Sequence, residues 1–152
     1  MYNYYAYPDK KRSRISQILI LPKYQNAGHG AELTECVLRD VYQCPRTVDV
    51  TAESPSSEFI RLRDYVTTKM CTTLPAFKDK VELKKGFSGQ MAKEALETFK
   101  IPKLQSRRCY EILRLACTNQ HNSEEWTDYR LDLKKRWRLF FFECSIFESL
   151  RI

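Results

Sequence analysis

Residues 15–21 read ISQILIL, and they are followed by Pro22 and by the loop KYQNAGHG of residues 23–30. The run is rich in β-branched and aliphatic side chains, and it stops at a residue that cannot donate to a strand ladder. Such a run predicts a buried central strand. After the loop, apolar residues recur at helical spacing, which predicts a core-facing stripe formed by Leu33, Val37, Leu38 and Val41.

The loop between this strand and this helix holds two of the four glycines of the chain, Gly28 and Gly30. A glycine loop at the start of a helix presents unpaired backbone amides at a positive helix end, where an anion such as a pyrophosphate can bind. The P-loop pattern and the three-glycine dinucleotide pattern are both absent. Spacing alone leaves a second reading equally open, in which the glycines only allow an unusual backbone conformation.

On either side of this unit, the sequence predicts further strands and a second helix. Residues 2–7, YNYYAY, precede the turn signal PDKK and predict a hairpin strand. Residues 47–53, TVDVTAE, alternate, so that Val48, Val50 and Ala52 face one side of a strand and Thr47, Asp49, Thr51 and Glu53 the other. Ser54-Pro55-Ser56 ends this strand and offers an N-cap for a helix over residues 58–71. The predicted order is strand, strand, helix, strand, helix.

Beyond Leu74-Pro75 the pattern becomes helical, with candidate helices near residues 90–99, 104–118 and 123–137. We therefore predict an α+β or α/β protein with a first unit of strands and helices over residues 1–75. A small helical subdomain over residues 76–138 and a tail over residues 139–152 follow it.

The net charge of +7 is distributed unevenly along the chain. Residues 1–60 hold seven basic and seven acidic side chains, so the whole excess lies in residues 61–152. A basic surface there fits either a solvated helical face or a nucleic-acid partner, but no nucleic-acid-binding module is recognisable. We therefore do not expect direct nucleic-acid binding.

Composition also bears on metals and membranes. The six cysteines are widely spaced, form no CxxC pair and accompany only two histidines, which argues against a zinc site and favours a reducing compartment. No run of about 18 apolar residues is present, so we expect no membrane span. The N-terminus has no apolar segment of the kind that a secretory signal needs.

Residues 25–31, QNAGHGA, resemble the Q/R-x-x-G-x-G/A signature of the GNAT superfamily of acetyltransferases. Several collinear blocks between about Tyr2 and Arg136 also resemble the catalytic subunits of type B histone acetyltransferases: YNYYAYPDKKRSRISQILIL, QNAGHGAEL, VDVTAESPS, FIRLRDYV and RRCYEILRL. The resemblance implies a partial GNAT fold, a mixed sheet with flanking helices. It also implies that the chain begins inside the family's catalytic domain and diverges from the family over residues 139–152.

The resemblance implies acetyl-CoA as cosubstrate, no metal, and a set of site residues. The pantetheine arm would pair with the backbone of Ile18, Leu19 and Ile20, and Ser56 would contact the cofactor. Glu53 would be the general base, and Asp49 is a weaker candidate for a supporting base. The pyrophosphate would lie on the backbone of the glycine loop, formed by Gln25, Asn26, Ala27, Gly28, His29, Gly30 and Ala31.

The function that the resemblance implies is the transfer of acetyl groups to lysine side chains of free histone tails. A WD-repeat histone chaperone would be the partner, and the nucleus and cytoplasm the location. The alternative is a catalytically incomplete protein that only binds histones or their chaperone.

Overall fold

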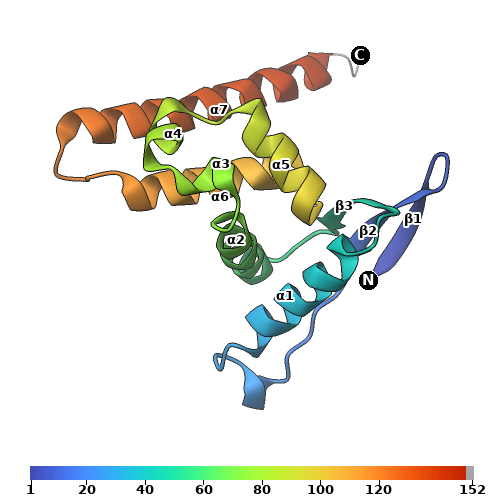
Figure 1. Cartoon of the computed structure of the whole chain (residues 1–152). Coiled ribbons are helices and arrows are strands. Elements are labelled where there is room, and N and C mark those ends of the chain that lie inside the picture. The colour runs from blue at the N-terminus through green and yellow to red at the C-terminus, as the bar shows by residue number, and fades with distance from the viewer. Residues whose placement is uncertain (150–152) are drawn as a thin grey trace.

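The computed structural model describes the backbone of residues 1–149 and the side chains of residues 1–137. Within this part, the chain forms a three-stranded mixed sheet and seven α-helices, which confirms a mixed α+β protein (Figure 1). The predicted tail of residues 139–152 lies outside the residues whose side chains are described. The elements are β1 Tyr2–Ala6, β2 Lys10–Ile15, the 3-10 helix η1 Pro22–Tyr24, α1 His29–Tyr42, β3 Thr47–Ala52, α2 Ser57–Cys71, α3 Pro75–Lys78, α4 Lys80–Lys85, α5 Gly89–Phe99, α6 Lys103–Cys117 and α7 Ser123–Ser149.

The sheet has the order β1-β2-β3. Strands β1 and β2 form the antiparallel hairpin that the aromatic run and its turn predict, with Ala6 opposite Lys10. Strand β2 pairs in parallel with β3, and Ile15 lies opposite Ala52 at the end of the ladder. Parallel neighbours need a long crossover, and helix α1 provides it here.

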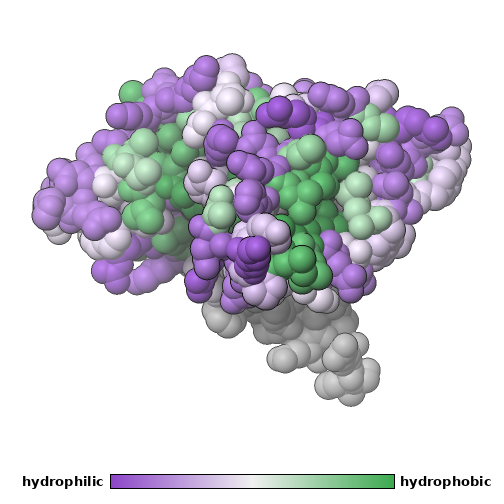
Figure 2. All heavy atoms as spheres, turned by 90° about the horizontal axis from the view of Figure 1, so that it is seen from below, coloured by the Kyte–Doolittle hydropathy of each residue, from purple (hydrophilic) through white to green (hydrophobic). Residues whose placement is uncertain are grey.

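The prediction of a buried strand over residues 15–21 is wrong. Strand β2 covers residues 10–15, and residues 16–21 belong to no strand. The ladder ends because β3 turns away: the Glu53 amide donates to the Ile15 carbonyl over 2.9 Å, and Ser54 then takes a φ of 38°. Leu19 and Leu21 are 78% and 58% exposed. Apolar side chains reach the surface in patches between polar ones on the face that Figure 2 shows.

Helices α1 and α2 pack on the apolar face of β3. Their cluster is formed by Ile15, Leu38, Val66 and Met70, with Val50 packed against it. The predicted stripe of α1 is only partly right, because Leu38 and Val41 are buried but Leu33 is 42% exposed.

A second cluster joins the end of α2 to the later helices. It consists of Cys71, Leu74, Phe77, Leu83, Met91, Ala95, Ile101, Cys109 and Tyr110. Helix α2 therefore contributes to both clusters. The division of the chain at residue 75 stays a prediction.

One buried carboxylate ties α2 to α6. The Asp64 side chain accepts hydrogen bonds from Arg108 Nε over 3.0 Å, from Arg108 Nη2 over 2.6 Å and from Gln105 Nε2 over 2.8 Å. Asp64 and Gln105 are each 7% exposed, so water cannot readily replace these bonds.

We expect Asp64→Asn to destabilise the protein by about 1–3 kcal/mol, because one of the two buried acceptor oxygens is replaced by an NH2 donor and the negative charge that faces Arg108 is lost. Urea denaturation followed by circular dichroism measures the change. Glu97→Gln is the control, because it removes an exposed partner of Lys93 at 3.9 Å and should change the stability little. Equal stability of Asp64→Asn and the wild type would contradict the role given to Asp64.

Candidate functional site

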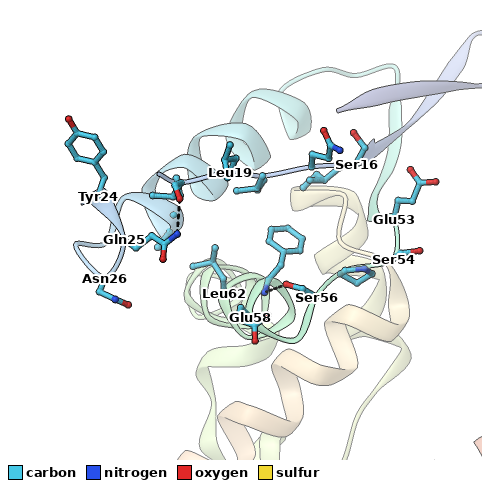
Figure 3. A pocket seen from close by; sticks show the side chains of 18 of the residues that line it. Ser16, Leu19, Tyr24, Gln25, Asn26, Glu53, Ser54, Ser56, Glu58 and Leu62 are labelled. Atoms are coloured by element: carbon cyan, nitrogen blue, oxygen red, sulfur yellow. Dashed lines mark hydrogen bonds between the residues drawn. The ribbon is translucent and has the colours of Figure 1, made fainter. Parts of the chain in front are cut away.

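The larger of two described cavities, with a volume of about 700 Å³, lies between residues 15–20, the glycine loop and the start of α2 (Figure 3). Pockets for small molecules and cofactors commonly have volumes of about 300–1,000 Å³. Only Glu53 and Glu58 among its lining residues carry a charge at neutral pH. The lining residues are Ile15, Ser16, Gln17, Ile18, Leu19, Ile20, Tyr24, Gln25, Asn26, Gly28, Gly30, Ala31, Glu53, Ser54, Pro55, Ser56, Glu58, Phe59 and Leu62.

The first wall of the cavity is the segment of residues 16–20 that follows β2. None of its backbone amides has a hydrogen-bond acceptor within the described part of the chain. The Ile20 carbonyl is occupied, because Gln25 Nε2 donates to it over 2.8 Å. This wall therefore offers a row of free backbone donors beside the point where β2 and β3 separate.

The second wall is the glycine loop, and both of its glycines meet a structural need. Gly28 is the N-cap residue of α1 and has a φ of 88°, a conformation that side chains with a Cβ rarely adopt. A Cβ at Gly30 would lie 3.3 Å from Leu62 Cδ2, so the absence of a side chain at Gly30 allows α1 and α2 to lie close to each other.

The loop also leaves backbone donors free at the start of α1. The amides of residues 26–30 have no acceptor among the described residues, whereas the Ala31 amide donates to the Gly28 carbonyl over 2.9 Å. Free amides at a helix N-terminus are the feature that suits a phosphate group. Ala31 therefore lines the cavity without a free donor.

The third wall is the N-terminus of α2. The Ser56 hydroxyl caps the helix as predicted, and it accepts a hydrogen bond from the Phe59 amide over 3.3 Å. Ser57 Oγ donates to Glu58 Oε1 over 2.7 Å, and this bond is the main reason that the pKa of Glu58 is lowered. Phe59 and Leu62 supply an apolar surface.

Glu53 lies at the opposite end of the cavity from Tyr24 and Asn26 (Figure 3). It accepts a hydrogen bond from the Tyr2 hydroxyl over 2.8 Å, and the hydroxyls of Tyr2 and Tyr4 are also 2.8 Å apart. The Arg14 guanidinium lies 4.9 Å from the centre of the Tyr4 ring. A solvent-accessible carboxylate thus borders the cavity and is held from β1.

The hydrogen bond to Tyr4, followed by the bond to Glu53, raises the pKa of Tyr2 to about 12. We did not predict Tyr2, Tyr4 or Arg14 as site residues from the sequence. The alternation of residues 2 and 4 on one face of a strand was the available signal, but strand pairing was needed to relate it to Glu53.

Asp49, the weaker candidate for a base, does not line the cavity. Its Oδ2 atom lies 3.1 Å from Arg12 Nη2, and its side chain is only 10% exposed. The Asp49 carboxylate is therefore paired with Arg12 and does not reach the cavity.

Ten of the twelve predicted site residues line the cavity, and Ala27 and His29 do not. His29 Nδ1 lies 3.6 Å from Glu32 Oε2, outside the cavity. Several lining residues were not predicted: Ile15, Ser16, Gln17, Tyr24, Ser54, Pro55, Glu58, Phe59 and Leu62. Ser54, Pro55 and Glu58 surround the predicted cap, so the helix start was the signal for them.

The residues that the structure describes include no group of three or more potential metal ligands. The described helices include none that is long and apolar enough to cross a membrane.

Comparisons with known proteins relate the chain to one group of enzymes. A family model described as the C-terminal part of the type B histone acetyltransferase catalytic subunit matches residues 63–115. The human type B histone acetyltransferase catalytic subunit is 48% identical over 136 residues, which cover 90% of this chain and 32% of the human protein. A Dictyostelium discoideum protein of the same name is 32% identical over 146 residues, which cover 90% of this chain and 29% of that protein. The chain thus spans about a third of the length of these relatives.

The contacts of Tyr2 predict an unusual titration. The raised pKa means that these contacts stabilise the neutral phenol, so their stabilising effect is complete below about pH 10 and is lost as the pH rises through about 12. Carbon NMR of the Tyr2 Cζ atom between pH 9 and about 13 follows this titration through its midpoint. Glu53→Gln should move the midpoint part of the way back toward 10. A midpoint near 10 in the unaltered chain would contradict the contacts.

Proposed function

We propose that this chain, which is related over 90% of its length to type B histone acetyltransferase catalytic subunits, binds acetyl-CoA in the larger cavity and uses it to acetylate a lysine. The observation that carries the proposal is the combination, in one cavity, of two rows of free backbone donors with a carboxylate at one end. The arrangement also supports assigning residues 1–75 to a partial GNAT fold.

The pantetheine arm of acetyl-CoA contains two amide groups, so it can pair with a backbone as a strand does. The free amides of residues 16–20 supply donors for such pairing, and Ile18, Leu19 and Ile20 lie in its middle. One of these amides, aimed at the thioester carbonyl, would stabilise the negative charge that develops there during acyl transfer. The thiol leaves readily, since an ordinary thiol has a pKa of about 8.5.

The pyrophosphate would lie on the free amides of residues 26–30 at the start of α1. No lysine or arginine lines the cavity in the described part of the chain, so these amides and the helix end would provide the main attraction. Gly28 is the critical position, because nothing lies within 4 Å of the place where its Cβ would be. That open space is where we place the phosphate oxygens.

Glu53 would accept the proton from the substrate amine. With a pKa of about 10.4, only about 4 in 10,000 lysine side chains are neutral at pH 7. Producing the neutral nucleophile therefore costs about 4–5 kcal/mol, and a positioned base reduces that cost. The hydrogen bond from Tyr2 to Oε2 fixes one oxygen of the carboxylate and leaves Oε1 for the amine.

We infer the substrate and partner from the relatives, which are named as type B histone acetyltransferase catalytic subunits. We propose free histone tails as the substrate, a WD-repeat histone chaperone as the partner, and the nucleus and cytoplasm as the location. We further propose that residues 76–138 form a separate small helical subdomain.

The cofactor site can be tested with a pair of glycine substitutions. Gly28 and Gly86 both have a positive φ, of 88° and 119°, and at neither position would an added Cβ meet another atom within 4 Å. Gly28→Ala should carry a backbone strain of about 1–2 kcal/mol in the left-handed region. Gly86→Ala should carry at least as much, because its φ of 119° and ψ of 170° lie in a region that essentially only glycine adopts. Only Gly28→Ala should weaken acetyl-CoA binding, by at least about tenfold, which calorimetry measures. Equal affinities would contradict the phosphate site, and no binding to the unaltered chain would favour the catalytically incomplete alternative.

The role of the base can be tested with Glu53→Gln, which keeps the shape of the side chain but not the proton acceptor. Turnover of a histone-tail peptide at pH 7 should fall by about 10²–10⁴-fold, and part of it should return at high pH. Acetyl-CoA affinity should stay unchanged. If the chain alone is inactive, the substitution is assayed in the human relative carrying residues 1–137 of this chain. A variant with most of its activity would mean that Glu53 is not the base.

A further inference from the structure

A second cavity lies between the sheet and the later helices, and it has no part in the proposed acetyl transfer. Its volume is about 230 Å³. Its walls come from the ends of β2 and β3, from α1, from α2, and from residues 99–105 between α5 and α6. Most of the surface is apolar, with Leu38, Val50 and Phe99 among the lining residues. The Val50 amide donates to the Lys100 carbonyl over 3.0 Å, which closes one side.

The charged side chains that line this cavity are all basic, namely Arg63 and Lys100. The Nζ atom of Lys100 already donates to the Glu97 carbonyl over 3.1 Å. Arg63 differs, because its Nε atom is buried and none of the described residues accepts a hydrogen bond from it. The Arg63 side chain is partly buried, and this burial lowers the pKa of its guanidinium.

The neighbouring carboxylate does not pair with Arg63. Asp64 directs its two oxygens to Arg108 and Gln105 instead. Within the described part of the chain, no aspartate or glutamate lines the cavity. A partly buried guanidinium gains most from a carboxylate or phosphate that can accept from its fork of donors.

We propose that the second cavity binds a small monocarboxylate with an apolar body, whose carboxylate lies on Arg63. The volume limits its size: about 230 Å³ lies below the range of about 300–1,000 Å³ that is usual for drug-sized ligands, so the cavity fits only a small molecule. A short aliphatic acid such as butyrate has this size. Its alkyl chain would contact the apolar wall around Leu38 and Phe99.

The test compares three probes on the full chain by NMR titration: sodium butyrate, n-butanol and inorganic phosphate. We expect butyrate to bind, and Arg63→Gln to weaken it at least tenfold. The matched control is Arg61→Gln on the same helix, because Arg61 is exposed and does not line the cavity. It should leave the affinity unchanged.

Three results would overturn the proposal. Butanol binding as tightly as butyrate would show a merely apolar void, and phosphate binding as tightly would show an anion site without an apolar wall. Unchanged butyrate affinity in Arg63→Gln would remove Arg63 from the site.

A measurement on the unaltered chain covers the case in which Arg63→Gln fails to fold. Nuclear Overhauser effects from the butyrate methyl group should reach the Phe99 ring, which lines only the second cavity. Effects to Phe59 instead would place butyrate in the larger cavity and would also refute the proposal.

Discussion

The separation of β2 from β3 is the feature on which the rest of the site depends. The two strands pair in parallel up to Ile15 and Ala52, and the hydrogen bond from the Glu53 amide to the Ile15 carbonyl is their last link. Beyond it, one strand continues as an extended segment without a partner, and the other turns into the cap of α2. Backbone donors that would otherwise be used within the sheet are thereby left beside a cavity, where a ligand that resembles a strand can use them.

Helix α2 organises the molecule around this separation. Phe59 and Leu62 near its start line the larger cavity, while Arg63 and Thr67 line the smaller one. Asp64 joins it to α6, and its last residues enter the second apolar cluster. One helix therefore positions both cavities relative to each other.

The two candidate carboxylates, Asp49 and Glu53, have different hydrogen-bond and ion-pair partners on the neighbouring strands. Asp49 lies within β3, and Glu53 directly follows the last residue of that strand. Arg12 pairs with Asp49, whereas Tyr2 donates to Glu53 and leaves it at the cavity. The difference arises because β2 places Arg12 beside Asp49, whereas β1 places Tyr2 beside Glu53.

Most of the helices, the hairpin and ten of the cavity-lining residues could be predicted from the amino-acid sequence alone. The strand from Thr47, the Ser56 cap and the start of α1 at the glycine loop could be predicted from local residue types and spacing, although β3 ends at Ala52, one residue earlier than predicted. The resemblance identified ten residues that line one cavity. Only the tertiary structure decided where β2 ends, which carboxylate stays free, and that Arg63 lacks an acceptor for its Nε atom. These depend on partners distant in the chain, and an apolar run such as residues 15–21 does not reveal whether a strand or a ligand will pair with it.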